Sequence, residues 1–229
     1  MSNKLAKKTV DNFTSRLHTA VDYHRELLLA VHGKRRQAAL ETMLAEQFTF
    51  NVVVLWEVFL SDLLLGYLVA SPKRYTDGLR EKIRQSIKER YGVVASDMLD
   101  FDIPRSFSLP KARLMVDPKQ FNITVQSADH LSRRANELLA APNARLFTLN
   151  PDEAQFVDFV IALRNFLAHR SKSAHAVLKA SIASLAGANA ALQATTLNFG
   201  TYLKTRDANG DTNSILIANR LIILASLLI

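Results

Sequence analysis

The sequence predicts an all-α protein, an up-and-down helical bundle with one long irregular insertion. Its 229 residues are 48% apolar, which supplies enough side chain for a substantial core. Seven Gly and six Pro are too few for a turn-rich β-sandwich or barrel. Apolar residues instead recur at the three- and four-residue spacing of amphipathic helices. We therefore expect a single helical domain over residues 1–229.

The first two helices are expected over residues 4–31 and 35–70. The first has apolar side chains at helical spacing until Gly33 ends the pattern: Val10, Phe13, Leu17, Val21 and Leu28. The second is apolar on nearly all sides over residues 48–60, so it should be the central helix of the bundle. Trp56 and the phenylalanines at helical spacing should therefore belong to the core rather than stack on bases.

A third helix is expected over residues 76–91, with Thr76 as its N-cap and Gly92 at its end. Its basic residues are interleaved with acidic ones, which is typical of a solvated helix. Three prolines then interrupt residues 93–123, which should form a long ordered loop with one short helix. Residues 127–140 return to a helical pattern.

The sequence Asn150-Pro151-Asp152-Glu153 is the clearest helix start in the chain. It combines an N-cap, a proline in the first turn and acidic side chains near the positive end of the helix dipole. The helix that follows should bury one face, formed by Phe156, Phe159, Val160, Leu163 and Leu167. After Ser171, an Ala-rich helix should run to about residue 198.

The C-terminal region should form a turn and a final helix. Residues 207–211 resemble a calcium loop but lack its closing Glu, so we interpret them as a polar turn. The apolar run over residues 215–229 contains Asn219 and Arg220 and is shorter than the roughly 20 apolar residues of a bilayer span. We expect a helix over 214–229 that is buried or covered by a partner, with a membrane-surface role as the alternative.

Composition excludes several kinds of chemistry. The chain has no Cys, which rules out disulfides, thiol nucleophiles and cysteine-ligated zinc or iron–sulfur clusters. The absence of Cys fits a reducing, cytoplasmic location. The N-terminal residues lack the unbroken apolar stretch of a secretory signal, so we expect no export by that route. The net charge of +8 favours an acidic partner such as nucleic acid.

Residues 159–206 contain no Asp or Glu but carry six cations: Arg164, Arg170, Lys172, Lys179, Lys204 and Arg206. An uncompensated positive stretch suits an RNA backbone, because each neutralised phosphate releases counterions. We assign Arg170, Lys172 and Lys179 to RNA binding. The alternative is a solvated face without a partner.

Arg164, Asn165 and His169 lie within this acid-free stretch. Arginine can neutralise a phosphorane, and histidine can exchange a proton near neutral pH. Together they provide what metal-free RNA cleavage needs, because the ribose 2′-hydroxyl is itself the nucleophile. The Arg-x4-His spacing alone is a weak signal, and a second match at Arg170 and His175 crosses an expected helix break. We therefore prefer the first match.

With this context the chain resembles the HEPN superfamily, helical domains whose active members carry an Arg, a polar residue, three variable residues and a His. Residues 164–169 fit that pattern at every fixed position. Residues 56–60 in the central helix, and Phe121-Asn122-Ile123 before the next helix, look like the RiboL-PSP and MAE-type branches. The resemblance covers about residues 40–180, with the helices over 4–32 and 214–229 as additions.

The resemblance implies a metal-independent endoribonuclease that acts on single-stranded RNA as a homodimer, often as a toxin of a toxin–antitoxin system or a phage-defence effector. It implies that Arg164 stabilises the phosphate, that His169 is the general base or acid, and that Asn165 orients the phosphate or His169. No metal or cofactor is expected. The expected partners are RNA, a second copy of the chain and an antitoxin protein, with no integral membrane association.

Helical geometry independently favours a dimer. An ideal helix places Arg164 and His169 about 140° apart and about 7.5 Å along the axis, so one chain alone offers a poor site. Two copies about a two-fold axis would bring two of each side chain to one cleft. Glu57 is either a buried charge paired with an arginine or a residue that orients the site, and we favour the structural role.

The alternative function is a HEPN-like module that binds nucleic acid or protein without cleaving. Metal binding has little support in the sequence, since the histidines of the first helix lack carboxylates at ligand spacing. We expect these histidines, His18, His24 and His32, to be solvated.

Overall fold

The computed structural model describes residues 2–100, 107–118, 123–194 and 198–229. Helices account for the regular structure of these residues, with no strand beyond one isolated antiparallel bridge between Arg206 and Thr212. The all-α prediction is therefore confirmed.

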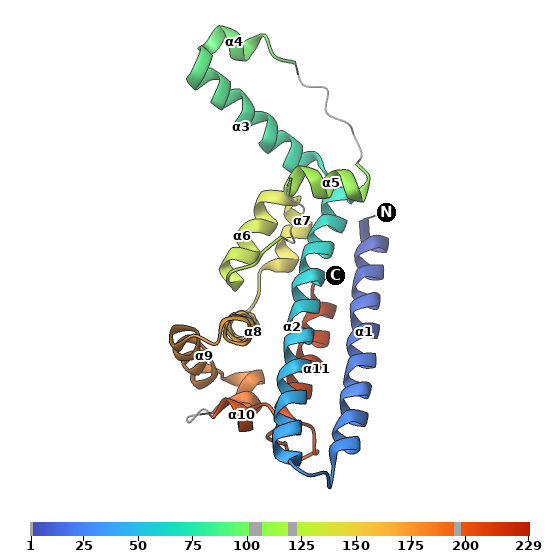
Figure 1. Ribbon diagram of the computed structural model, residues 1–229. Coiled ribbons are helices and arrows are strands. Elements are labelled where there is room, and N and C mark those ends of the chain that lie inside the picture. Colours follow the sequence, from blue (N-terminus) through green and yellow to red (C-terminus); the bar gives the residue numbers. More distant parts are fainter. Residues whose placement is uncertain (1, 101–106, 119–122, 195–197) are drawn as a thin grey trace.

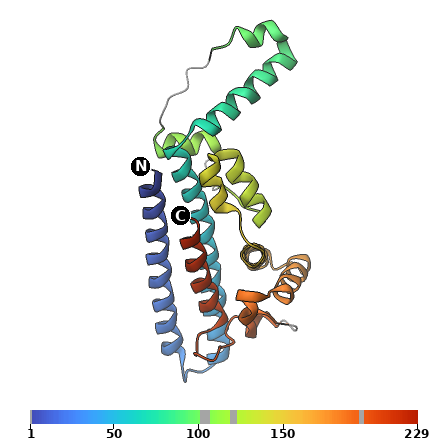
Figure 2. The same ribbon diagram turned by 180° about the vertical axis from the view of Figure 1, so that it is seen from behind.

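Three long helices form the body of the molecule. Helix α1 (Ser2–Val31), helix α2 (Gln37–Ala70) and helix α11 (Asn213–Leu227) run side by side in both views (Figures 1 and 2). Their boundaries match the predicted helices closely. Phe13 of α1 stacks on Phe59 of α2, with ring centroids 4.4 Å apart. Their contact places aromatic side chains at the centre of the core.

Helix α2 is the central helix, as predicted. Trp56 is fully buried in it, and most sides of its second half are covered. It is the one helix in the described part of the chain that is long and apolar enough to cross a bilayer, and 67% of its most apolar 18-residue stretch is buried inside the fold. The apolar character of α2 is thus largely used in packing.

The terminal helix α11 is buried on one face, as expected for this apolar segment. Its residues Ile215, Leu221 and Leu224 lie in the core. The Tyr67 hydroxyl of α2 donates a hydrogen bond to the carbonyl of Leu228 at 2.8 Å and so fixes the end of the helix. Burial raises the pKa of this Tyr67 hydroxyl.

Helix α3 (Lys73–Tyr91) and helix α4 (Val93–Asp97) stand out from the body as an arm (Figures 1 and 2). Thr76 is not the N-cap of α3, because the helix already begins after Pro72. Its hydroxyl instead donates to the Lys73 carbonyl within the first turn.

Two short helices, α4 and α5 (Leu109–Val116), interrupt the segment that was expected to hold only one. Ser108 caps α5 by accepting a hydrogen bond from the Lys111 N–H. Residues 101–106 and 119–122 lie outside the described residues, and so do Phe121 and Asn122 of the family resemblance.

Four helical segments follow: α6 (Ala128–Leu138), α7 (Ala141–Ala144), the 3-10 helix η1 (Arg145–Phe147) and α8 (Pro151–His169). The predicted start of α8 is confirmed by a reciprocal capping box. The Glu153 N–H donates to Asn150 Oδ1 at 2.9 Å, and the Asn150 N–H donates to Glu153 Oε2 at 3.0 Å. Its predicted apolar face is buried except at Leu167, which is only half-buried.

The Ala-rich helix ends earlier than predicted. Helix α9 (Lys172–Ser184) is followed by the 3-10 helix η2 (Gly187–Leu192) and helix α10 (Phe199–Tyr202). Gly187 has a φ of +54°, and the Asp152 carboxylate accepts a hydrogen bond from the next N–H, that of Ala188, at 3.0 Å. This contact from the start of α8 fixes the turn, which helical periodicity alone does not reveal.

His24 does not have the solvated environment expected for the histidines of α1. It is 2% exposed and stacks on Phe48, with centroids 4.2 Å apart and ring planes 9° apart. Burial lowers the pKa of His24 to about 4. His18 and His32 are exposed, as expected.

The polar turn near the C-terminus is confirmed. Asp207 Oδ1 accepts hydrogen bonds from the N–H groups of Asn209 and Asp211, both at 2.9 Å. These bonds close the turn within its own residues.

Candidate functional site

Arg164 lies where α8 crosses α2. Its Nε atom is 3.2 Å from Glu57 Oε1, and its Nη1 atom donates to Asn165 Oδ1 at 3.1 Å. The side chains of Arg164 and Glu57 are 34% and 22% exposed, so the pair is shielded but still reached by water. The capped helix α8 and the core helix α2 therefore fix the direction of this guanidinium.

The electrostatics of Glu57 reflect two opposing effects. Burial raises the pKa of its carboxyl, while the charge and the hydrogen bond of Arg164 lower it. Burial is the larger effect, so the pKa of Glu57 lies above its usual value. The ion pair thus only partly offsets the cost of removing the carboxylate from water.

His169 is the last residue of α8 and is exposed. Within the described part of the chain it has no hydrogen-bond or ion-pair partner. Because α8 is helical from Arg164 to His169, their directions differ by about 140°. Arg164 is held against α2 while His169 faces solvent, so one protomer does not bring the two side chains together.

Arg170, predicted to bind RNA, is exposed, but its guanidinium already has partners within the chain. Its two terminal nitrogens contact the Glu46 carboxylate of α2 at 2.7 and 3.3 Å. Its guanidinium also lies over the rings of Phe166 and Phe199, at 5.1 and 5.6 Å from the centroids. The residue adopts a left-handed backbone with a φ of 50° and ends α8.

In the folded chain, part of the positive charge of the acid-free stretch over residues 159–206 is therefore neutralised. Glu57 and Glu46 of α2 neutralise Arg164 and Arg170 across the helix contact. Sequence reasoning missed this because the acids lie more than a hundred positions earlier in the chain. Lys172 and Lys179 are exposed and have no ion-pair partner among the described residues, so these two remain available to a polyanion.

The second Arg-x4-His match is closer in space than its sequence suggests. A break at Arg170 and Ser171 separates α8 from α9, as predicted. The turn nevertheless places the His175 ring 5.4 Å from the Phe166 ring, which Arg170 also covers. Arg170 and His175 thus both contact the Phe166 ring, and any cleavage assay must test them too.

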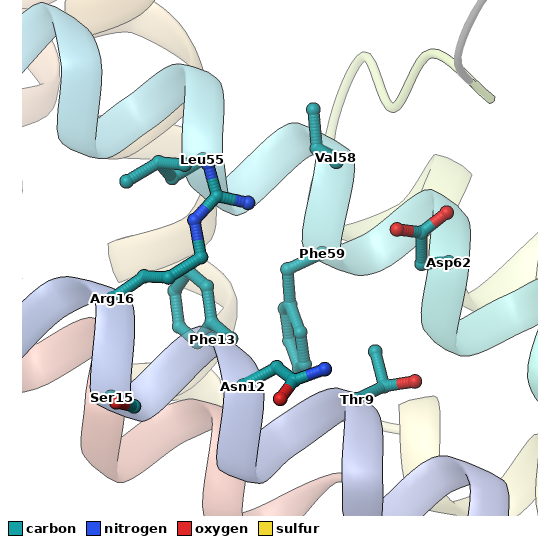
Figure 3. Close-up of a pocket in the computed structure, with 9 residues that line it drawn as sticks. All are labelled: Thr9, Asn12, Phe13, Ser15, Arg16, Leu55, Val58, Phe59 and Asp62. Carbon is teal, nitrogen blue, oxygen red and sulfur yellow. The ribbon is translucent and has the colours of Figure 1, made fainter.

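A polar groove of about 290 Å³ lies between α1 and α2 (Figure 3). Figure 3 shows the guanidinium of Arg16 on α1 beside Leu55 of α2, whereas Asn12 and Thr9 of α1 lie toward Phe59 and Asp62. Asp62 is also paired with Arg113 of α5. The groove contains none of the three predicted catalytic residues, so it is a separate feature of the surface.

Among the residues that the structure describes, no group of three or more His, Asp or Glu side chains is arranged to hold a metal ion. Comparisons with known proteins give no match to a family model, a curated protein or a solved structure.

Proposed function

We propose that this chain is a HEPN-type, metal-independent endoribonuclease that cleaves single-stranded RNA as a homodimer, with a role as a toxin or phage-defence effector. The observation that carries the proposal is the exposed imidazole of His169, which has no partner among the described residues, on the same helix as the fixed guanidinium of Arg164. Lys172 and Lys179 follow on the next helix and supply free positive charge for the RNA backbone.

The proposed reaction is a transesterification. His169 accepts the proton of the ribose 2′-hydroxyl, and the resulting oxygen attacks the adjacent phosphorus. The bond from phosphorus to the 5′-oxygen breaks, and that oxygen takes a proton from a general acid. The products are a 2′,3′-cyclic phosphate and a 5′-hydroxyl.

Arg164 has donors left for the phosphate. A guanidinium carries five N–H groups, and among the residues with a described position only Glu57 and Asn165 contact it, one N–H each. Glu57 therefore orients the guanidinium without consuming its capacity to bind a phosphorane.

A second copy would supply the acid and complete the site. Val54 of α2 lies one turn before Glu57 and is 36% exposed. Ile161 of α8 lies one turn before Arg164 and is half-buried. This apolar surface beside the ion pair is suited to cover by a symmetry-related chain, in which the His169 of each copy serves the other as base or acid.

The decisive variant is His169→Ala. This side chain has no partner in the described structure, so its removal should leave unfolding unchanged while abolishing cleavage of single-stranded RNA. Product ends should be a cyclic phosphate and a 5′-hydroxyl, and chelators should leave the rate unchanged. Cleavage by His169→Ala at the parent rate would refute the proposal.

The matched control is His175→Gln, which alters the competing Arg-x4-His match. This variant should cleave as the parent does. If His175→Gln abolishes cleavage and His169→Ala does not, the catalytic pair is the one at Arg170 and His175.

A non-cleaving binding module is the second candidate, and the pairing of Arg164 with Glu57 favours it. In that case the guanidinium is mainly structural, and the exposed lysines bind RNA without chemistry. RNA binding by the parent protein without any cleavage would select this function.

A further inference from the structure

A cleft of about 370 Å³ lies where the arm meets the body, between α3, α5 and α6, the same elements that converge in Figure 1. Its size falls in the range of about 300 to 1,000 Å³ that is typical of small-molecule sites. Three cations line it: Arg74 and Lys82 of α3, and Arg134 of α6. Glu137 is the one acidic side chain among its nine lining residues, all of them described.

On the α3 side of the cleft, Gly78 leaves the helix surface without a side chain between the cations Arg74 and Lys82. Arg74, Gly78 and Lys82 follow at four-residue intervals, so they share one face of the helix over about 12 Å. A Cβ added at Gly78 would meet nothing within 4 Å. A glycine inside a helix is unfavourable relative to alanine, and here it leaves the backbone open to a ligand.

Some side chains that line the cleft are held in place by contacts within the protein, whereas two of its cations are unpaired among the described residues. The Tyr75 hydroxyl donates to the Met115 carbonyl at 2.8 Å, which fixes its ring, and Leu138 is a buried apolar wall. Arg134 is paired with Glu137 at 3.0 Å. Arg74 and Lys82, in contrast, have no ion-pair or hydrogen-bond partner among the described residues.

We propose that this cleft binds a small phosphorylated ligand of nucleotide size. The phosphates lie over Gly78 between Arg74 and Lys82, where two unpaired cations match their charge. The apolar part of the ligand packs against Tyr75 and Leu138. The site is independent of the proposed ribonuclease chemistry, since it shares no residue with it.

The first test uses the full-length protein and three probes in calorimetric titrations at low salt: ATP, inorganic pyrophosphate and adenosine. ATP should bind, pyrophosphate should bind more weakly, and adenosine should not bind detectably. Lys82→Gln should weaken ATP binding by about tenfold. Lys88→Gln removes the same charge from the same helix outside the cleft and should change binding less than twofold.

A second set of variants includes one that should strengthen ATP binding and one that should block it. Glu137→Gln releases Arg134 and should strengthen ATP binding several-fold, an effect that a loss of folding cannot mimic. Gly78→Gln should block the cleft, while Gly78→Ala should still bind.

The proposal is overturned if ATP fails to bind at millimolar concentration, or if Lys88→Gln weakens binding as much as Lys82→Gln. It is also overturned if short single-stranded RNA displaces ATP at equal phosphate concentration, because the cleft is then an RNA contact. His169→Ala should bind ATP as the parent does, so failure of this site and failure of the ribonuclease proposal are distinguishable.

Discussion

Arg164 of α8 and Glu57 of α2 form an ion pair with 3.2 Å between Nε and Oε1. The pair joins the helix that carries the candidate motif to the central helix of the fold. Burial raises the pKa of Glu57 more than Arg164 lowers it. Ionisation of Glu57 is therefore unfavourable in the fold even though its carboxylate is paired.

The two partners should therefore respond differently to neutralisation. Arg164→Gln leaves a shielded carboxylate unpaired. It should lower the free energy of unfolding by about 1 to 2 kcal/mol at pH 7, a figure that already allows for solvent access to the pair. Glu57→Gln removes an ionisation that burial disfavours and should change stability by less than about 0.5 kcal/mol. Urea unfolding of both variants measures this difference, and a larger cost for Glu57→Gln would contradict it.

The pKa direction of Glu57 also fixes a pH dependence. With its pKa raised in the fold, the native state holds this proton to higher pH than the unfolded chain does. The stability that Glu57 contributes is then complete below its ordinary pKa and is lost as pH rises through the folded value. Glu57→Gln should remove that slope from the unfolding free energy.

His24 should dominate the response to mild acid. Its pKa falls from 6.5 to about 4 in the fold, so the unfolded chain binds the proton more readily between these values. Its stabilising contribution is present above pH 6.5 and should fall by about 3 kcal/mol as pH approaches 4. Urea unfolding at pH 7 and pH 4.5 measures the loss.

The matched variants for this prediction are His24→Phe and His18→Gln. His24→Phe keeps a ring against Phe48 but cannot ionise, so it should flatten the pH dependence. His18→Gln alters an exposed histidine of the same helix and should not. Equal pH dependence in His24→Phe and the parent protein would show that His24 is not the responsible group.

Gly187 should be far less tolerant of alanine than Gly210. Both have positive φ values, but a Cβ at Gly187 would collide with the Asp152 carboxylate, whereas Gly210 faces open space. Gly187→Ala should cost about 1 kcal/mol more than Gly210→Ala, since the latter suffers backbone strain alone. Thermal unfolding of the two variants gives the comparison, and equal losses would remove the role of Asp152.

The lysines of α9 should set the salt dependence of RNA binding. If Lys172 and Lys179 each neutralise one phosphate, replacing both with Gln should reduce the slope of log affinity against log salt by about 1.4 for single-stranded RNA. The control pair Lys7→Gln and Lys8→Gln removes two exposed charges from α1 and should leave the slope unchanged. Filter binding at several salt concentrations distinguishes the two pairs.

Local chemistry made α8 predictable. The bonds that begin it join Asn150 to Glu153, three residues apart, so the sequence already contains both partners. The end of α9 was not predictable in this way, because the Asp152 carboxylate that fixes the turn comes from a different helix. Boundaries set by distant side chains leave no periodic signal.

The same distinction applies to the candidate site. The sequence places Arg164, Asn165 and His169 on one capped helix, and the structure keeps them there. It does not reveal that two glutamates of α2 compensate Arg164 and Arg170, because charge counted along the chain ignores neighbours in space. His24 was assigned to solvent for a related reason, since it occupies a position of α1 that Phe48 covers.

Glu46 and Glu57 lie eleven positions apart on α2, which puts them on one face about three turns from each other. Their carboxylates pair with Arg164 and Arg170, which precede and follow His169 in the sequence. The backbone under the imidazole is thus tied at two points to the central helix of the fold. In the proposed ribonuclease, fixing this part of α8 beforehand would lower the reorganisation needed on each turnover, and breaking either ion pair would slow cleavage without altering the imidazole.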